Sequence, residues 1–194
     1  MIDSGKGGIA FCNSIKKNID CLEPTLIIDE EGFPYGNKDL FWLKDRINYL
    51  MEKSEDNMVF VACNTLSSVI FHYNMLFKKK VVDVITPTIY FLNQQDFQNI
   101  IILATENTIK MDIYSKFLDI DVTYIDATEL IYDIENELDI EVSLDKVLLA
   151  LSISGDAVLL GCTHLIEVKD LIREKMDKIL ISQDEIFIDF FHIN

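Results

Sequence analysis

Short apolar runs alternate with segments of helical spacing along most of this chain. The apolar runs have strand character and lie at residues 25–28, 58–62, 81–85, 99–104, 122–125, 157–160 and 179–181. The helix-like segments lie at residues 9–19, 40–53, 66–77, 109–118, about 128–151 and 165–176. Strands that alternate with helices form parallel sheets covered by helices on both faces. The pattern therefore predicts an α/β fold with doubly wound, mainly parallel sheets.

The order of strands and helices starts afresh near the middle of the chain. Residues 90–97 read as a connection, and a clear apolar strand opens a new unit at 99–104. We therefore predict a domain boundary near Gln94 and Gln95, with a first α/β lobe at 1–94 and a second at 95–182.

Charge and composition exclude several classes of partner. The 194 residues carry a formal net charge of -16, which repels nucleic acid and anionic membrane surfaces. The N-terminus lacks the pattern of a signal peptide, and no stretch reaches the roughly 18 apolar residues of a membrane span. We expect a cytoplasmic protein whose four cysteines are free thiols. Because no paired CxxC spacing occurs, we expect no metal site.

Two cysteines stand at matching places in the pattern. Cys63 and Cys162 each end an apolar strand and precede a helix-like segment. The field of a helix N-terminus favours a thiolate and lowers the thiol pKa. Either cysteine alone would more often be an inert buried residue, but the repeated placement favours a reactive pair. His164 could orient Cys162 or exchange a proton with it, although a helix-capping or solvent-facing histidine is an equal alternative.

Other polar residues also follow predicted strands. Asp3, Ser4 and Thr105 lie at strand ends, where doubly wound sheets bind ligands. The glycine-rich loop at residues 3–8 precedes a helix and could hold an anionic group, or could simply be a turn that starts the helix. Structural roles are the simpler interpretation for the remaining cysteines and histidines, namely Cys12, Cys21, His72 and His192.

Four short segments together resemble the signature segments of the glutamate racemase family. They are residues 3–8, 34–38, 62–65 and 161–164, and they stand in the same order and at similar separations. The resemblance implies two similar lobes with the active site in the cleft between them. It also implies inversion at Cα of glutamate without a cofactor, producing D-glutamate for peptidoglycan precursors of the cell wall.

The same resemblance implies roles for individual residues. Cys63 and Cys162 would be the two acid/base thiols, with Asp3 assisting the first and His164 the second. The residues that would bind the amino acid are Ser4, Pro34, Tyr35, Gly36, Asn64, Thr65, Thr105, Thr108 and Thr163. A second-lobe acid that assists the second thiol would fall near Glu135, Asn136 or Glu137.

The chain also departs from the family pattern. It is several dozen residues shorter, mostly after His164, so that only residues 183–194 could begin the helical return to the first lobe. A homodimer interface in place of the missing helices is an open alternative. Two other functions are also weighed, a racemase for another acidic amino acid such as aspartate, and a non-catalytic homologue that binds an amino acid or acts in regulation.

Overall fold

The computed structural model describes residues 1–19 and 23–193 and contains two parallel sheets. The strand order is β2-β1-β3-β4 in the first sheet and β6-β5-β7-β8 in the second. The first sheet comprises β1 (Ile2–Asp3), β2 (Ile27–Ile28), β3 (Met58–Val61) and β4 (Lys80–Asp83). The second comprises β5 (Asn99–Ala104), β6 (Asp121–Asp126), β7 (Ala157–Leu160) and β8 (Ile179–Ser182). The two sheets share one order of strands, and the predicted α/β class with two similar lobes is confirmed.

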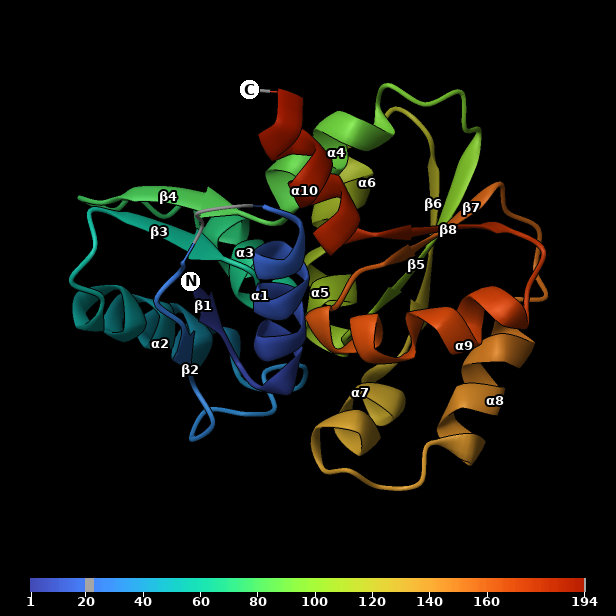
Figure 1. The fold of residues 1–194 in the computed structure, drawn as a ribbon, viewed down its shortest axis with the longest axis horizontal. Coiled ribbons are helices and arrows are strands. Elements are labelled where there is room, and N and C mark those ends of the chain that lie inside the picture. The colour runs from blue at the N-terminus through green and yellow to red at the C-terminus, as the bar shows by residue number, and fades with distance from the viewer. Residues whose placement is uncertain (20–22, 194) are drawn as a thin grey trace.

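Helices connect the strands and fill the space between the sheets (Figure 1). In the first half of the chain they are α1 (Lys6–Asn18), α2 (Leu40–Lys53), α3 (Asn64–His72) and α4 (Ile85–Leu92). In the second half they are α5 (Glu106–Met111), α6 (Ile113–Phe117), α7 (Thr128–Glu135), α8 (Glu141–Ala150), the 3-10 helix η1 (Thr163–Val168), α9 (Lys169–Glu174) and α10 (Gln183–Ile193). Helices α1, η1 and α10 contact one another where the two lobes meet.

The strand register brings the polar strand ends together. Ile2 of β1 pairs with Val61 of β3, so Asp3 and Cys63 follow at the same edge of the first sheet. In the second sheet Leu103 of β5 pairs with Leu160 of β7, which places Thr105 and Cys162 at one edge in the same way. Parallel strands present their carboxyl ends on one side, where ligands bind in such sheets.

Apolar packing joins the two lobes as well as filling each one. A single cluster of buried side chains includes Phe11 and Leu66 of the first lobe and Ile102 and Leu159 of the second. All four are essentially inaccessible to solvent. Burial of this kind stabilises the arrangement of the lobes in proportion to the apolar area removed from water.

The first three residues of one predicted connection belong to a helix. Residues 90–97 were expected to link the lobes, but α4 already begins at Ile85 and continues to Leu92. Pro87 falls in the first turn of α4, where the backbone N–H has no partner within the helix and proline is tolerated. Asp83 supports this start, because its carboxylate accepts hydrogen bonds from the N–H and the hydroxyl of Thr86. The domain boundary at residues 94 and 95 stays a prediction.

Two predicted helices are divided by local backbone geometry. The segment 109–118 breaks at Asp112, whose φ of 50° lies in the left-handed region that aspartate tolerates. The segment after Cys162 starts as the 3-10 helix η1 and becomes α-helical only at Lys169. The predicted helix at 66–77 starts earlier, at Asn64, and ends at His72.

The last described helix packs on the first lobe. α10 contacts α1 and α4, and Asp184 near its start is fully buried. The Asp184 carboxylate accepts hydrogen bonds from Ser14 of α1 at 2.6 Å and from Lys169 of α9 at 3.1 Å. Cys12 lies buried in α1, and His72 is exposed. Cys21 and the side chain of His192 lie outside the described part of the structure.

Two isoleucines of the second sheet provide a matched test of the apolar core that the two lobes share. Ile102 in β5 is fully buried, whereas Ile179 at the start of β8 is 57% exposed. We predict that Ile102→Ala lowers the free energy of unfolding by about 2–5 kcal/mol, because it leaves a cavity in the shared core. Ile179→Ala should change it by about 0.5 kcal/mol or less. Urea denaturation measures both, and equal losses would contradict the assigned core.

Candidate active site

A cavity of about 470 Å³ opens between the two lobes at the carboxyl ends of the strands. Eleven of the residues singled out from the sequence line it, namely Ser4, Pro34, Tyr35, Gly36, Cys63, Asn64, Thr65, Thr105, Cys162, Thr163 and His164. Asp3 and Thr108 are buried behind the wall, and the candidates for the second-lobe acid at 135–137 also lie outside the lining. The lining residues that the sequence did not single out are Phe33, Asn37, Asp126, Thr128, Glu129, Ile131 and Tyr132.

Cys63 lies between the end of β3 and the start of α3 and is only 6% exposed. Its Sγ is 4.0 Å from the Oγ of Ser4. Burial raises the pKa of the Cys63 thiol well above its ordinary value, and the nearby charge of Asp3 raises it further. The prediction that the helix N-terminus lowers the pKa is therefore wrong for Cys63, because desolvation of the thiolate outweighs the N–H of Leu66.

Cys162 follows β7 and has an imidazole as its neighbour. Its Sγ is 3.6 Å from Nδ1 of His164, and His164 is itself almost fully buried. Burial alone would lower the pKa of His164, but its hydrogen bonds to Cys162 and Glu135 prevail and raise that pKa to about 10. At neutral pH the imidazole is therefore protonated and faces the sulfur as a cation.

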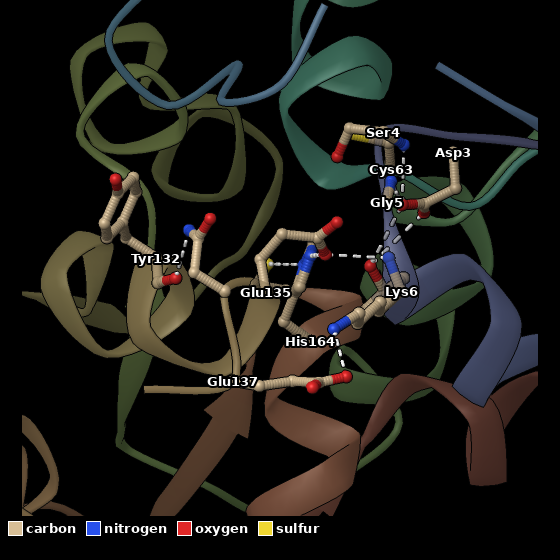
Figure 2. Close-up of polar contacts among 12 residues, drawn as sticks. Asp3, Ser4, Gly5, Lys6, Cys63, Tyr132, Glu135, Glu137 and His164 are labelled. Atoms are coloured by element: carbon tan, nitrogen blue, oxygen red, sulfur yellow. Dashed lines mark hydrogen bonds and ion pairs between the residues drawn. The ribbon is translucent and has the colours of Figure 1, made fainter. Parts of the chain in front are cut away.

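Glu135 completes this arrangement and resolves the register of the second-lobe acid. Its Oε2 lies 2.7 Å from Nε2 of His164, at the end of α7. Glu137 is instead 82% exposed at its side chain and pairs with Nζ of Lys6 at 2.7 Å. Asn136 bonds back to the carbonyl of Tyr132. Figure 2 shows Glu135 pointing to His164 while Glu137 points to Lys6.

The start of α1 binds an acid of the chain itself. The backbone N–H of Lys6 donates a hydrogen bond of 2.8 Å to Oε2 of Glu135. A helix N-terminus favours a negative charge at this place. The Lys6 N–H is therefore not available to an anionic ligand group, because a carboxylate of the second lobe already accepts it. That the loop at residues 3–8 holds such a group stays a prediction.

Asp3 is a buried carboxyl that links the two lobes. Its Oδ1 accepts a hydrogen bond of 2.7 Å from the N–H of Ser4, and its Oδ2 accepts one of 3.2 Å from the hydroxyl of Thr163. Complete burial raises the pKa of Asp3, although His164 and these donors oppose the effect. A carboxyl with a raised pKa next to a thiol is suited to proton exchange.

Three threonine hydroxyls meet across the interface. Thr65 of the first lobe lies 2.9 Å from Thr105 of the second, measured between their Oγ1 atoms. Thr108 lies behind them, with its Oγ1 3.0 Å from that of Thr105. Thr65 and Thr105 thus present hydroxyls to the cavity, while Thr108 supports them from within.

The side chains of Asn64 and Tyr35 make hydrogen bonds within the protein. Asn64 Oδ1 accepts from the Tyr114 hydroxyl at 2.8 Å, and its Nδ2 donates to Oε1 of Gln183 at 2.6 Å. The Tyr35 hydroxyl donates to the carboxylate of Asp29, which also pairs with Arg46. At Tyr35 the backbone therefore remains to contact a ligand, and at Asn64 the backbone and the second N–H of the side-chain amide remain.

Gln183 is a buried residue that sequence reasoning missed. Its Nε2 donates to Thr88 Oγ1 at 3.0 Å and to the Tyr114 hydroxyl at 2.8 Å, besides its bonds to Asn64. It therefore connects the first residue of α10 to both lobes. No local pattern marks a glutamine at the start of a helix, since its partners are distant in sequence.

Within the described residues, no group of three His, Cys, Asp or Glu side chains could hold a metal ion. A helix able to cross a bilayer is likewise not found in that part of the chain. The described cysteines, Cys12, Cys63 and Cys162, are all free thiols.

Comparison with known proteins decides the family. A glutamate racemase of Buchnera aphidicola subsp. Schizaphis graminum is 31% identical over 199 residues, covering 92% of this chain and 76% of that protein. A glutamate racemase of Aliivibrio salmonicida is 30% identical and covers 95% of this chain and 74% of its own length. The chain belongs to the glutamate racemase family. It spans about three quarters of the length of these relatives. No family model matches it.

Solved structures of glutamate racemases share the fold. The isoform RacE1 of Bacillus anthracis superposes with a TM-score of 0.87 at 23% identity, covering 99% of this chain and 79% of that one. The Francisella tularensis glutamate racemase, solved in complex with D-glutamate, superposes with a TM-score of 0.82 at 20% identity, covering 99% and 78%. An aspartate racemase of Picrophilus torridus superposes with a TM-score of 0.65 at 20% identity, covering 95% and 88%.

The Glu135–His164 pair makes stability depend on pH in a defined direction. Because the pKa of His164 is raised from 6.5 to about 10, protonation stabilises the folded state. This contribution is complete below pH 6.5 and is lost as the pH rises through 10. We predict that Glu135→Gln lowers the free energy of unfolding at pH 6 and that its difference from wild type shrinks towards pH 10.

Urea denaturation at a series of pH values measures this difference. Glu137→Gln is the matched control, since Glu137 is exposed and does not contact His164. A Glu135→Gln difference that stays constant from pH 6 to 10 would contradict a charged His164.

Proposed function

We propose that this chain racemises glutamate with two thiols. The observation that carries the proposal is that Cys63 of the first lobe and Cys162 of the second line one cavity. Each has its own ionisable neighbour, Asp3 for Cys63 and His164 for Cys162. Inversion at a carbon needs one group to remove a proton and another to deliver one from the opposite face. Two thiols on separate lobes supply such a pair.

The protonation state of Cys63 suggests which thiol delivers the proton to Cα. Cys63 has a raised pKa and is a thiol at neutral pH, so it delivers a proton to Cα. The sulfur of Cys162, on the other lobe, is then the base that takes the α-proton while the carbon keeps the electron pair. His164 and Glu135 balance the charge beside Cys162. After one turnover the protons have moved from Cys63 to Cα and from Cα to Cys162, and the reverse direction exchanges the roles.

Hydroxyls and backbone groups would bind the amino acid. None of the described residues that line the cavity is a lysine or arginine. The carboxylates would therefore be held by Ser4, Thr65, Thr105 and Thr163, and by the backbone N–H groups of Tyr35 and Gly36, while Pro34 lines the cavity beside them. Donors fixed in advance around the reacting carbon stabilise a carbanion in a cavity shielded from water. The complexes of relatives with D-glutamate and with L-glutamate support glutamate as the ligand.

Four further proposals concern the use of the product, the cofactor, the cellular location and the assembly. We propose that the D-glutamate serves peptidoglycan precursors, that the reaction needs no cofactor, and that the chain acts in the cytoplasm. A homodimer is proposed as the assembly.

Deuterium incorporation tests the activity. In heavy water, L-glutamate should lose optical rotation and gain deuterium at Cα, because the delivered proton comes from a thiol that exchanges with solvent. Cys63→Ser and Cys162→Ser should each reduce the rate by roughly 10²–10⁴-fold, the range of acid–base catalysis. Polarimetry and mass spectrometry measure both effects. Cys12→Ala is the control, since Cys12 is buried outside the cavity.

A competing function would give a different pattern. If glutamate and aspartate stayed chiral and unlabelled while the folded wild type bound one of them, the chain would be a non-catalytic amino-acid-binding homologue. Labelling of aspartate without labelling of glutamate would assign the other substrate.

A further inference from the structure

We propose that Gly5 is a positioning residue, because its lack of a side chain leaves the space in which the Glu135 carboxylate reaches both α1 and His164. This inference rests on the proposed function, since Glu135 supports the histidine beside the second thiol. Its physical basis is that the Glu135 carboxylate of the second lobe occupies the space that a side chain on Gly5 of the first lobe would fill.

The space at Gly5 is filled by the end of a single side chain. A Cβ placed on Gly5 would lie 2.5 Å from Oε2 of Glu135 and 2.7 Å from both its Cδ and Oε1. Real Cβ atoms essentially never come this close to another heavy atom. Any larger residue at position 5 must therefore displace the Glu135 carboxylate.

The backbone of Gly5 does not itself require glycine. Its φ of -173° and ψ of -152° are extended, and other residues adopt such a φ without strain. The constraint on position 5 therefore comes from Glu135. Gly7, the second residue of α1, differs in this respect. A Cβ there would lie 2.5 Å from the backbone N of His164, so no side-chain substitution could relieve the clash.

One oxygen of Glu135 makes the two contacts that a displacement would break. Oε2 accepts the Lys6 N–H of the first lobe at 2.8 Å and lies 2.7 Å from Nε2 of His164 in the second. Figure 2 shows this carboxylate between Gly5 and Lys6 on one side and the imidazole on the other. The His164 hydrogen bond and the Lys6 N–H lower the pKa of Glu135 against the opposing effect of burial.

The charged groups around this contact are few. Asp3 and Cys162 lie on the buried side of His164, and Lys6, paired with Glu137, lies on the exposed side of Glu135. The backbone N–H of Gly5 donates to Oδ1 of Asp3 at 3.4 Å, but the atoms nearest to a Cβ added on Gly5 all belong to Glu135. A change at Gly5 should therefore reach His164 through Glu135.

A double-mutant cycle separates this account from a general effect on folding. The variants are Gly5→Ala, Glu135→Ala and the two combined, with Gly5→Ala plus Glu137→Ala as the control. All atoms that the new methyl group would strike are absent in Glu135→Ala. The first readout is the pH titration of the His164 imidazole by NMR in the ligand-free protein, and the second is the rate of glutamate racemisation.

We expect Gly5→Ala to lower the midpoint of the His164 titration by about one pH unit or more, as loss of a close opposite charge does. It should also reduce turnover by about a hundredfold, the scale of a misplaced catalytic group. In the Glu135→Ala background, Gly5→Ala should change neither quantity further. In the Glu137→Ala background its full effect should remain.

Two results would overturn the inference. One is a His164 midpoint that Gly5→Ala leaves unchanged, and the other is an equal further loss when Gly5→Ala is added to Glu135→Ala. If wild type failed to racemise glutamate while the titration followed the expected pattern, the proposed function would fail and the positioning role of Gly5 would stand.

Discussion

The hydrogen bonds at one oxygen of Glu135 determine the surroundings of the second thiol. This carboxylate is held by the Lys6 N–H at the start of α1 and in turn keeps His164 protonated beside Cys162. A buried imidazolium would be unstable alone, because burial disfavours charge. The first lobe thus contributes directly to the chemistry of a cysteine in the second. The contact between the two lobes therefore also sets the surroundings of this half of the site.

Elsewhere in the interface, too, buried polar groups of one lobe depend on hydrogen-bond partners from the other. Thr163 donates to the buried Asp3, and Thr65 meets Thr105. Gln183 joins Asn64 to Tyr114. Polar groups buried between the lobes lose free energy of solvation unless a partner on the other lobe replaces water. These pairs are therefore satisfied in only one relative position of the lobes, the position in which both thiols line the cavity.

Much of this arrangement could be predicted from the chain alone. The alternation of strands and helices predicts parallel sheets, and Cys63 and Cys162 stand where such sheets bind ligands. Interactions distant in sequence could not be predicted. The strand predicted at 81–85 ends at Asp83, and α4 begins at Ile85 with Pro87 in its first turn. The choice between Glu135 and Glu137 needed the position of α7 relative to α1, and the raised pKa of Cys63 needed its burial.

Early deuterium distribution is the most direct test of two thiols acting from opposite faces. L-glutamate is incubated with the protein in heavy water, and the reaction is stopped at a few per cent conversion. The two enantiomers are then separated, and the deuterium content of each is measured by mass spectrometry. With separate donor and acceptor thiols, the D-glutamate formed should carry deuterium while the recovered L-glutamate should carry almost none. Equal labelling of the two enantiomers would show a single group exchanging its proton with solvent, and would contradict the account.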